Sequence, residues 1–248
     1  MQFSDSQNML LEVSSQTNGN AGYAAKSSIR HVHRALGLKS TMPEVSAFLA
    51  ITAEEEASTA LFSALKNKRY ARAKELKKNS HLHKAGVYPF LILLGETIGI
   101  GSGELPVEMT FNIPNDSENK ILRTRMLIGK SDGMVHYVYP DPPLNLVSVD
   151  ASGNVKDYLK DIRSVAFEKG IKSIHEYIKT VANIRNQMLY ASDSSIPNIK
   201  NVDEMLQRHI GATFLIHAMY LFIAQQPKQK LVEECLDIYL KTLSRVES

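Results

Sequence analysis

The sequence of 248 residues lacks most of the features that would place it in a specialised class of protein. Its single cysteine, Cys235, excludes an internal disulfide and fits a reducing compartment. The first residues have neither the basic patch nor the long apolar run of a secretory signal, and no stretch is apolar over the length of a membrane span. A hydrophobic content of 44% excludes an intrinsically disordered chain. We therefore expect a soluble, cytoplasmic globular protein without membrane contact.

Several enzyme signatures are also missing or incomplete. The segment 129–131 (Gly-Lys-Ser) ends like a phosphate-binding loop, but the first glycine of that loop is absent and no helix follows. Two His-x-His pairs, His31/His33 and His81/His83, would point about 200° apart on a helix, so neither pair converges on a metal. No Glu-x-x-His of a dimetal bundle occurs. The sequence therefore predicts neither a metal site nor a cofactor.

What is present is helical periodicity at both ends of the chain and alternation in the middle. The apolar spacing predicts helices at 21–38, 43–67, 82–98 with a kink near Pro89, 154–169, 172–191, 202–224 and 228–245, and a charged helix through the seventies. Alternating residues predict strands near 107–113, 122–128, 134–139 and 144–149. We expect a mainly α protein of one domain over 1–248, a helical bundle interrupted by a small antiparallel β-meander at about 105–150. Within it, 210–223 is apolar nearly all round and should form the central helix.

Two charged side chains fall on apolar helix faces. In the helix from Pro43, Glu56 lies in the middle of the apolar stripe, while Glu54 and Glu55 turn to its sides. Arg185 lies within the stripe of the helix at 172–191. A buried carboxylate needs a partner, so we expect Glu56 and Arg185 to meet, either as a structural ion pair or as the floor of a site.

Positive charge is concentrated in one short segment. The whole chain carries a net charge of only +3, but the 19 residues from Lys66 to Lys84 contain eight lysines and arginines against one glutamate, a net +7. Such a segment either binds a phosphate backbone or forms a solvated face. The candidate nucleic-acid-binding residues are Lys66, Lys68, Arg69, Arg72, Lys77, Lys78, His81 and Lys84, with Arg123 and Arg125 as an extension of the patch on a predicted strand.

Two stretches resemble a known family. The segments 53–61 (AEEEASTAL) and 81–84 (HLHK) resemble the AbiV group of abortive-infection proteins, which has a Glu-Glu pair in an alanine-rich helix followed by His-x-x-Lys. The resemblance places the acid pair on Glu55 and Glu56 and the later motif on His81 and Lys84. That group belongs to the HEPN superfamily of helical bundles, so the resemblance implies a HEPN-like fold, a role in phage defence and a homodimer.

A further stretch, 184–190 (IRNQMLY), resembles the motif of HEPN ribonucleases, in which an arginine and a polar residue precede a histidine. Arg185 and Asn186 match the first two positions, and Tyr190 stands where the histidine belongs. Imidazole titrates near neutral pH, whereas a phenol has a pKa of about 10, so the exchange changes the acid–base chemistry available. The candidate catalytic residues are Glu56, Arg185, Asn186 and Tyr190.

The sequence leaves three functions open. The first is an AbiV-like, HEPN-like defence protein that binds RNA, the translation apparatus or a phage protein, favoured by the basic segment and the missing histidine. The second is a metal-independent endoribonuclease in which Arg185 stabilises the phosphorane and Tyr190 replaces the histidine. The third is a non-catalytic structural or interaction bundle whose inward charges only stabilise the core. Salt-dependent RNA binding separates the first two from the third.

Overall fold

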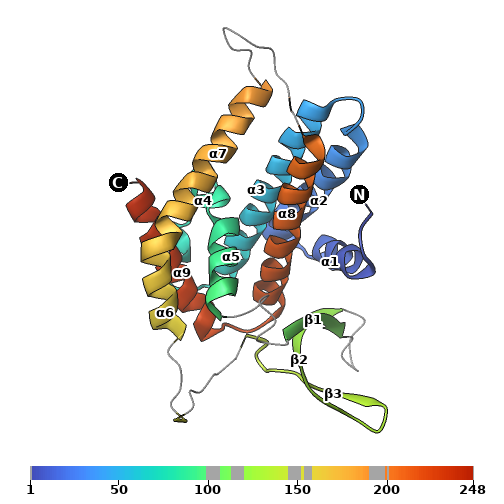
Figure 1. The fold of residues 1–248 in the computed structure, drawn as a ribbon, viewed down its shortest axis with the longest axis vertical. Coiled ribbons are helices and arrows are strands. Elements are labelled where there is room, and N and C mark those ends of the chain that lie inside the picture. Colours follow the sequence, from blue (N-terminus) through green and yellow to red (C-terminus); the bar gives the residue numbers. More distant parts are fainter. Residues whose placement is uncertain are drawn as a thin grey trace.

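The computed structural model describes residues 2–98, 107–112, 120–144, 152–153, 158–189, 199 and 201–247. It is mainly α, with long helices side by side in a bundle and a small sheet below one end of it (Figure 1). The elements in chain order are α1 (Asp5–Gln16), α2 (Gly19–Leu38), α3 (Pro43–Asn67), the 3-10 turn η1 (Ala73–Glu75), α4 (His81–Ala85), α5 (Val87–Ile98), β1 (Val107–Asn112), β2 (Ile121–Ser131), β3 (Met134–Val138), α6 (Tyr158–Val165), the π-helical turn η2 (Ala166–Gly170), α7 (Ile171–Leu189), α8 (Val202–Gln225) and α9 (Lys230–Glu247).

The centre of the bundle is built from α2, α3 and α8. Nearly every residue of α8 between 209 and 223 is buried, which confirms the prediction of a central helix there. A chain of hydrogen bonds joins the three helices: His217 Nε2 lies 3.1 Å from Ser28 Oγ, which donates to the Ala53 carbonyl at 2.7 Å. Because both bonds are buried, they fix the axial register of α2, α3 and α8 in addition to the apolar packing.

The sheet is a three-stranded antiparallel meander in the order β1-β2-β3, which confirms the predicted β insertion within its described part. Asp132 and Gly133 both have positive φ angles in the tight turn between β2 and β3. Leu122 is buried, and its N–H donates to the Gln225 side chain at the end of α8, which attaches the sheet to the bundle. Of the strand expected at 144–149, Leu144 lies in a turn and the remainder falls outside the described residues.

Two helix predictions were wrong in detail. The seventies contain a turn with the short η1 and no long charged helix, since the positive φ of Arg69 follows the end of α3 and the positive φ of Arg72 precedes η1. The predicted helix at 82–98 is divided at Gly86 into α4 and α5, three residues before Pro89. Pro89 lies in the first turn of α5, where no backbone N–H is needed, so it starts a helix and does not kink one.

None of the helices in the described ranges is long and apolar enough to cross a membrane.

Candidate functional site

Three consecutive glutamates of α3 contact four neighbouring helices, α2, α4, α7 and α8. Glu54 and Glu55 are buried, and Glu56 is half-buried with a hydrogen bond to Ser27 of α2. The prediction that Glu56 faces the core while Glu54 and Glu55 turn aside was therefore wrong. That prediction assumed that α3 buries a single face. The helix packs against α2, α4, α7 and α8, so residues 100° apart are enclosed by different helices.

Glu55 is the acid that contacts His81 and Lys84, the two residues of the His-x-x-Lys motif. Its carboxylate lies 2.8 Å from His81 Nδ1 and 3.1 Å from Lys84 Nζ. The Lys84 side chain is 10% exposed and that of His81 is 60% exposed, so the carboxylate and the ammonium are enclosed while the imidazole lies at the surface. A carboxylate that holds one ring nitrogen of a histidine fixes the orientation of the ring. Residues 26 to 29 positions apart in the sequence thus form one polar cluster.

Glu54 forms a second, fully enclosed cluster with α7 and α8. It accepts hydrogen bonds from the Tyr177 hydroxyl at 2.8 Å and from His209 Nδ1 at 2.6 Å. Burial, and then the Glu54 carboxylate, raise the pKa of Tyr177, so its hydroxyl stays protonated and remains a donor. The Arg208 guanidinium lies over the Tyr177 ring, 4.7 Å from its centroid. Because this cluster is closed to solvent, we assign it the structural task of holding α7 on α3 and α8.

Glu56 faces α2, where it forms a hydrogen bond with Ser27. Burial raises the pKa of the Glu56 carboxyl, and the neighbouring Glu55 raises it further, whereas Lys84 opposes both. The charge of Lys84, which pairs with Glu55, thus also favours the charged form of Glu56.

Part of the basic segment converges on an open hollow beside the Glu55 cluster. Three lysines, Lys66, Lys77 and Lys78, line it together with Asn79 and Ser80. Lys66 crosses the turn to donate to the Leu76 carbonyl at 2.7 Å, and its pKa is lowered by burial and then by the positive charge of Lys78. A lysine whose pKa is lowered by a neighbouring positive charge favours an anion beside it.

Buried side chains and hydrogen bonds attach the turn that forms the hollow to the rest of the bundle. Tyr70, Ala73 and Leu76 are buried, and the Tyr70 hydroxyl accepts a hydrogen bond from the Gln229 backbone. The Lys77 backbone N–H donates to His83 Nδ1 at 3.3 Å. The next residue after the hollow-lining Ser80 is His81, so the hollow and the Glu55 cluster adjoin along the chain at the start of α4. We call it the α3–α4 site, defined by Glu55, Lys66, Lys77, Lys78, Asn79, Ser80, His81 and Lys84.

The other predicted basic residues do not join this site. Arg72 forms ion pairs with Glu75 at 2.7 Å and with Asp237 of α9 at 2.5 Å. On the sheet, Arg123 pairs with Asp141, and Arg125 pairs with Glu108. The predicted residues Lys68 and Arg69 lie on the turn after α3 and outside the hollow. Carboxylates thus neutralise part of the predicted patch, which the local charge count did not show.

The backbone of α7 carries Arg185 and Asn186, but their side chains, and all of Tyr190, lie outside the described residues. The register of α7 on α3 is set by Tyr177 on Glu54 and, one turn on, by Val181 in a small apolar cluster with Ile51. Arg185 therefore lies near the level of the first turn of α3, about 15 Å along the helix axis from Glu56. The pairing of Glu56 with Arg185, and the catalytic role of this motif, stay predictions.

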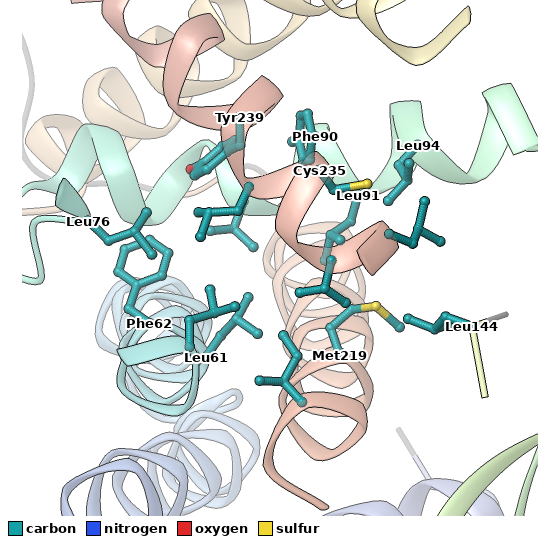
Figure 2. Close-up of a pocket in the computed structure, with 16 residues that line it drawn as sticks. Leu61, Phe62, Leu76, Phe90, Leu91, Leu94, Leu144, Met219, Cys235 and Tyr239 are labelled. Atoms are coloured by element: carbon teal, nitrogen blue, oxygen red, sulfur yellow. The ribbon is translucent and has the colours of Figure 1, made fainter. Parts of the chain in front are cut away.

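A separate apolar cavity of about 100 Å³ lies between α3, α5, α8 and α9 (Figure 2). Leu61, Phe62 and Met219 form part of its wall, with Cys235 on the opposite side. Burial raises the pKa of the Cys235 thiol to about 12, so it is not a nucleophile at neutral pH. The Tyr239 hydroxyl donates to the backbone of α4. The cavity therefore has no polar group that would orient a substrate.

Within the described part of the chain, no group of three or more His, Cys, Asp and Glu side chains is arranged to hold a metal ion. The chemistry of the α3–α4 site is that of ammonium groups, an imidazole and a buried carboxylate. Such a set binds anions and transfers protons.

Comparison with known proteins finds no family profile that matches the sequence, no similar curated protein and no similar solved structure. The class of protein is therefore defined by the structure alone. It is a mainly α, bundle-like fold with a three-stranded antiparallel sheet inserted after α5.

Sequence reasoning missed the partners of Glu54. Tyr177 lies 123 positions away and His209 lies 155 positions away, and both belong to helices that the pattern predicted without their contacts. One signal was available: His209 directly precedes the apolar stretch 210–223 of α8, and a histidine buried there needs a partner.

Proposed function

We propose that this protein binds RNA through the α3–α4 site, as a HEPN-like defence protein of the AbiV type. The observation that carries the proposal is the hollow in which Lys66, Lys77 and Lys78 converge with Asn79 and Ser80. Lysine ammonium groups and small polar side chains are the usual donors to phosphate oxygens, and a positive hollow concentrates a polyanion. The residues that resemble the AbiV motif support the same placement, because His81 directly follows Ser80 of the hollow and contacts Glu55, which also pairs with Lys84.

RNA binding and its salt dependence test this proposal. The probe is a labelled single-stranded RNA of mixed sequence, titrated with protein at several salt concentrations. The variant Lys77→Gln/Lys78→Gln removes two hollow-lining charges, and Lys172→Gln/Lys230→Gln is the control, since it removes the same charge from two exposed lysines on α7 and α9.

Loss of two phosphate contacts should reduce the salt slope of log K by about 1.4 and weaken binding about tenfold or more at low salt. The control should bind like the wild type. Equal weakening in both double variants, or no binding by the wild type at about 0.1 M salt, would overturn the proposal, and a protein partner would then replace RNA.

A second candidate, a metal-independent endoribonuclease, is favoured by one observation. Position 190 lacks an imidazole, but His81 supplies one: the Glu55 carboxylate holds its Nδ1, and His81 directly follows Ser80 of the lysine hollow. In such a reaction the 2′-oxygen forms a bond to phosphorus and the P–O5′ bond breaks. A base takes the 2′-proton, and an acid protonates the leaving 5′-oxygen. The lysines of the hollow would stabilise the phosphorane charge.

RNA incubated in the presence of a metal chelator separates these functions. Cleavage that is lost in His81→Gln, with binding retained, would assign the reaction to the α3–α4 site. Cleavage lost in Arg185→Ala and Tyr190→Phe, and retained in His81→Gln, would assign it to the α7 motif. Bound but intact RNA in every sample would leave the binding function alone.

A further inference from the structure

A second positive surface lies on α2, outside the segment from Lys66 to Lys84. Between Glu12 and Glu44 the sequence contains no acidic residue, but it contains Lys26, Arg30, Arg34 and Lys39. Lys39 pairs with Asp203 of α8. The other three remain as a row of cations along α2.

The three cations occupy one exposed row of the helix. Lys26, Arg30 and Arg34 follow one another at intervals of four residues, so each lies about 6 Å beyond the last along the axis and is rotated by only about 40°. All three are exposed, as is His33 beside them. Together with Ile29 and with Ser15 of α1, they line a shallow open hollow. The row therefore presents positive charge along a groove and not as scattered side chains.

No carboxylate in the described part of the chain neutralises this row. The ion pairs formed there do not include Lys26, Arg30 or Arg34. Glu12, on the neighbouring α1, is bound to Lys120 at 3.3 Å, and Glu56 reaches the flank of α2 only at Ser27. This distinguishes the row from Arg72, Arg123 and Arg125, which all have carboxylate partners.

The half-buried His31 reports the local electrostatic field. Its pKa is lowered first by burial and then by the charges of Arg34 and Arg30. The row is thus positive enough to disfavour a further proton on its own helix, and a bound anion would relieve this repulsion.

An aromatic ring completes the row at its N-terminal end. Tyr23 is 70% exposed, and Lys26 Nζ lies 5.9 Å from the centre of its ring. By helical geometry, Tyr23, Lys26, Arg30, His33 and Arg34 share a sector of about 100°. From Tyr23 to Arg34 the sector extends for about 17 Å, the length of about five stacked nucleotides.

The opposite face of α2 makes this surface rigid. Ala25, Ser28, Val32 and Ala35 are buried against the bundle, and Ser28 donates to the Ala53 carbonyl of α3. The cations and the ring are therefore held on a fixed backbone, so only side-chain freedom is lost on binding.

From these observations we infer that the outer face of α2, from Tyr23 to Arg34, binds single-stranded RNA, with a base stacked on Tyr23 and the backbone following Lys26, Arg30 and Arg34. The inference rests on the proposed function, because it names the kind of RNA and a second contact surface. Charges in a row with an exposed aromatic ring are the features that recognise unpaired strands. A duplex keeps its bases stacked inside, so it offers none to Tyr23.

Two probes and two variants test the inference. The probes are a labelled 12-nucleotide oligouridine and a labelled 12-base-pair RNA duplex. Tyr23→Ala removes the ring, with Tyr139→Ala, another exposed tyrosine, as its control. Lys26→Gln/Arg30→Gln removes two cations, with Lys172→Gln/Lys230→Gln as its control. All six substituted side chains are exposed, and circular dichroism with thermal melting verifies that each variant folds.

Tyr23→Ala should weaken oligouridine binding roughly 5- to 150-fold, with the salt slope and the duplex affinity unchanged. Lys26→Gln/Arg30→Gln should reduce the salt slope for oligouridine by about 1.4. The two control variants should bind like the wild type. Wild-type affinity in Tyr23→Ala, or equal weakening for oligouridine and duplex, would overturn the inference.

The two proposals fail in distinguishable ways. Weakening by Lys77→Gln/Lys78→Gln together with wild-type binding in both α2 variants would leave the α3–α4 site and refute the α2 surface. Weakening in both α2 variants, together with wild-type binding by Lys77→Gln/Lys78→Gln, would support the α2 surface and refute the α3–α4 site. A wild-type protein that binds neither probe would refute both.

Discussion

A buried histidine at the centre of the bundle predicts that the protein loses stability in mild acid. The side chain of His217 is fully buried, and its Nε2 lies 3.1 Å from Ser28 Oγ. Since that hydroxyl gives its own proton to the Ala53 carbonyl, we place the imidazole proton on Nε2. Nδ1 has no hydrogen-bond partner among the described residues, so a second proton there would place an unpaired charge in the core.

The pKa of His217 decides the direction and size of the effect. Burial lowers this pKa from 6.5 to about 4. The unfolded chain therefore binds a proton below pH 6.5 that the folded chain refuses until about pH 4, so the stabilisation is complete above pH 6.5 and is lost as the pH falls. Through this residue alone, the free energy of unfolding should decrease by about 2 kcal/mol at pH 5 and about 3 kcal/mol at pH 4, relative to pH 7.5.

Urea denaturation between pH 4 and pH 7.5 measures this loss, with His217→Gln as the comparison. The glutamine amide can donate to Ser28 Oγ but does not titrate, so other groups contribute equally to both proteins. The unfolding free energy of the wild type minus that of the variant should decrease by about 3 kcal/mol from pH 7.5 to pH 4. A difference that stays constant over this range would refute the reasoning, because it would mean that the folded and unfolded chains bind protons equally at this position.

Three further predictions concern packing and reactivity. Tyr177→Phe removes a donor to a buried carboxylate and should lower the unfolding free energy in urea by about 1–3 kcal/mol, and no change would mean that the hydroxyl is not needed there. Gly22→Ala places a Cβ against the Thr17 carbonyl oxygen and should lower the melting temperature. Gly37→Ala, on the same helix, places its Cβ in open space and should raise the melting temperature. Equal shifts in the two variants would contradict this packing. Cys235 should resist a thiol reagent at pH 8 until urea unfolds the chain, because it is buried and its pKa is raised to about 12, and fast labelling without urea would contradict this.

The spacing of apolar residues along the sequence was sufficient to predict the long helices and the strands. The boundaries of α2, α3 and α8 and the three described strands lie close to the predicted ranges, because a helical or alternating pattern of apolar residues that continues over many positions follows the period of the element. The same reasoning failed in the seventies, where Tyr70, Ala73 and Leu76 follow helical spacing. Their burial is achieved by a turn, stabilised by Arg72 through Asp237 of the distant α9, and no local pattern contains that contact.

The candidate site was predicted in its residue types and not in its geometry. His81 and Lys84 were singled out beside an acid pair, and they do meet one acid, Glu55. The face of α3 was misassigned because a stripe describes a helix with one buried side, whereas neighbours surround α3 on several sides. The charge count likewise included Arg72 and Arg123, which the fold pairs with carboxylates.

The sequence by itself determined the class of fold, the location of the β insertion and the excess of positive charge between Lys66 and Lys84, because these follow from composition and spacing along the chain. Only the tertiary structure decided which charges remain available to a ligand. Ion pairs and burial are made by residues far apart in the sequence, as Glu54 with His209 and Lys39 with Asp203 demonstrate. The row from Lys26 to Arg34 and the hollow at Lys66, Lys77 and Lys78 are therefore properties of the folded chain.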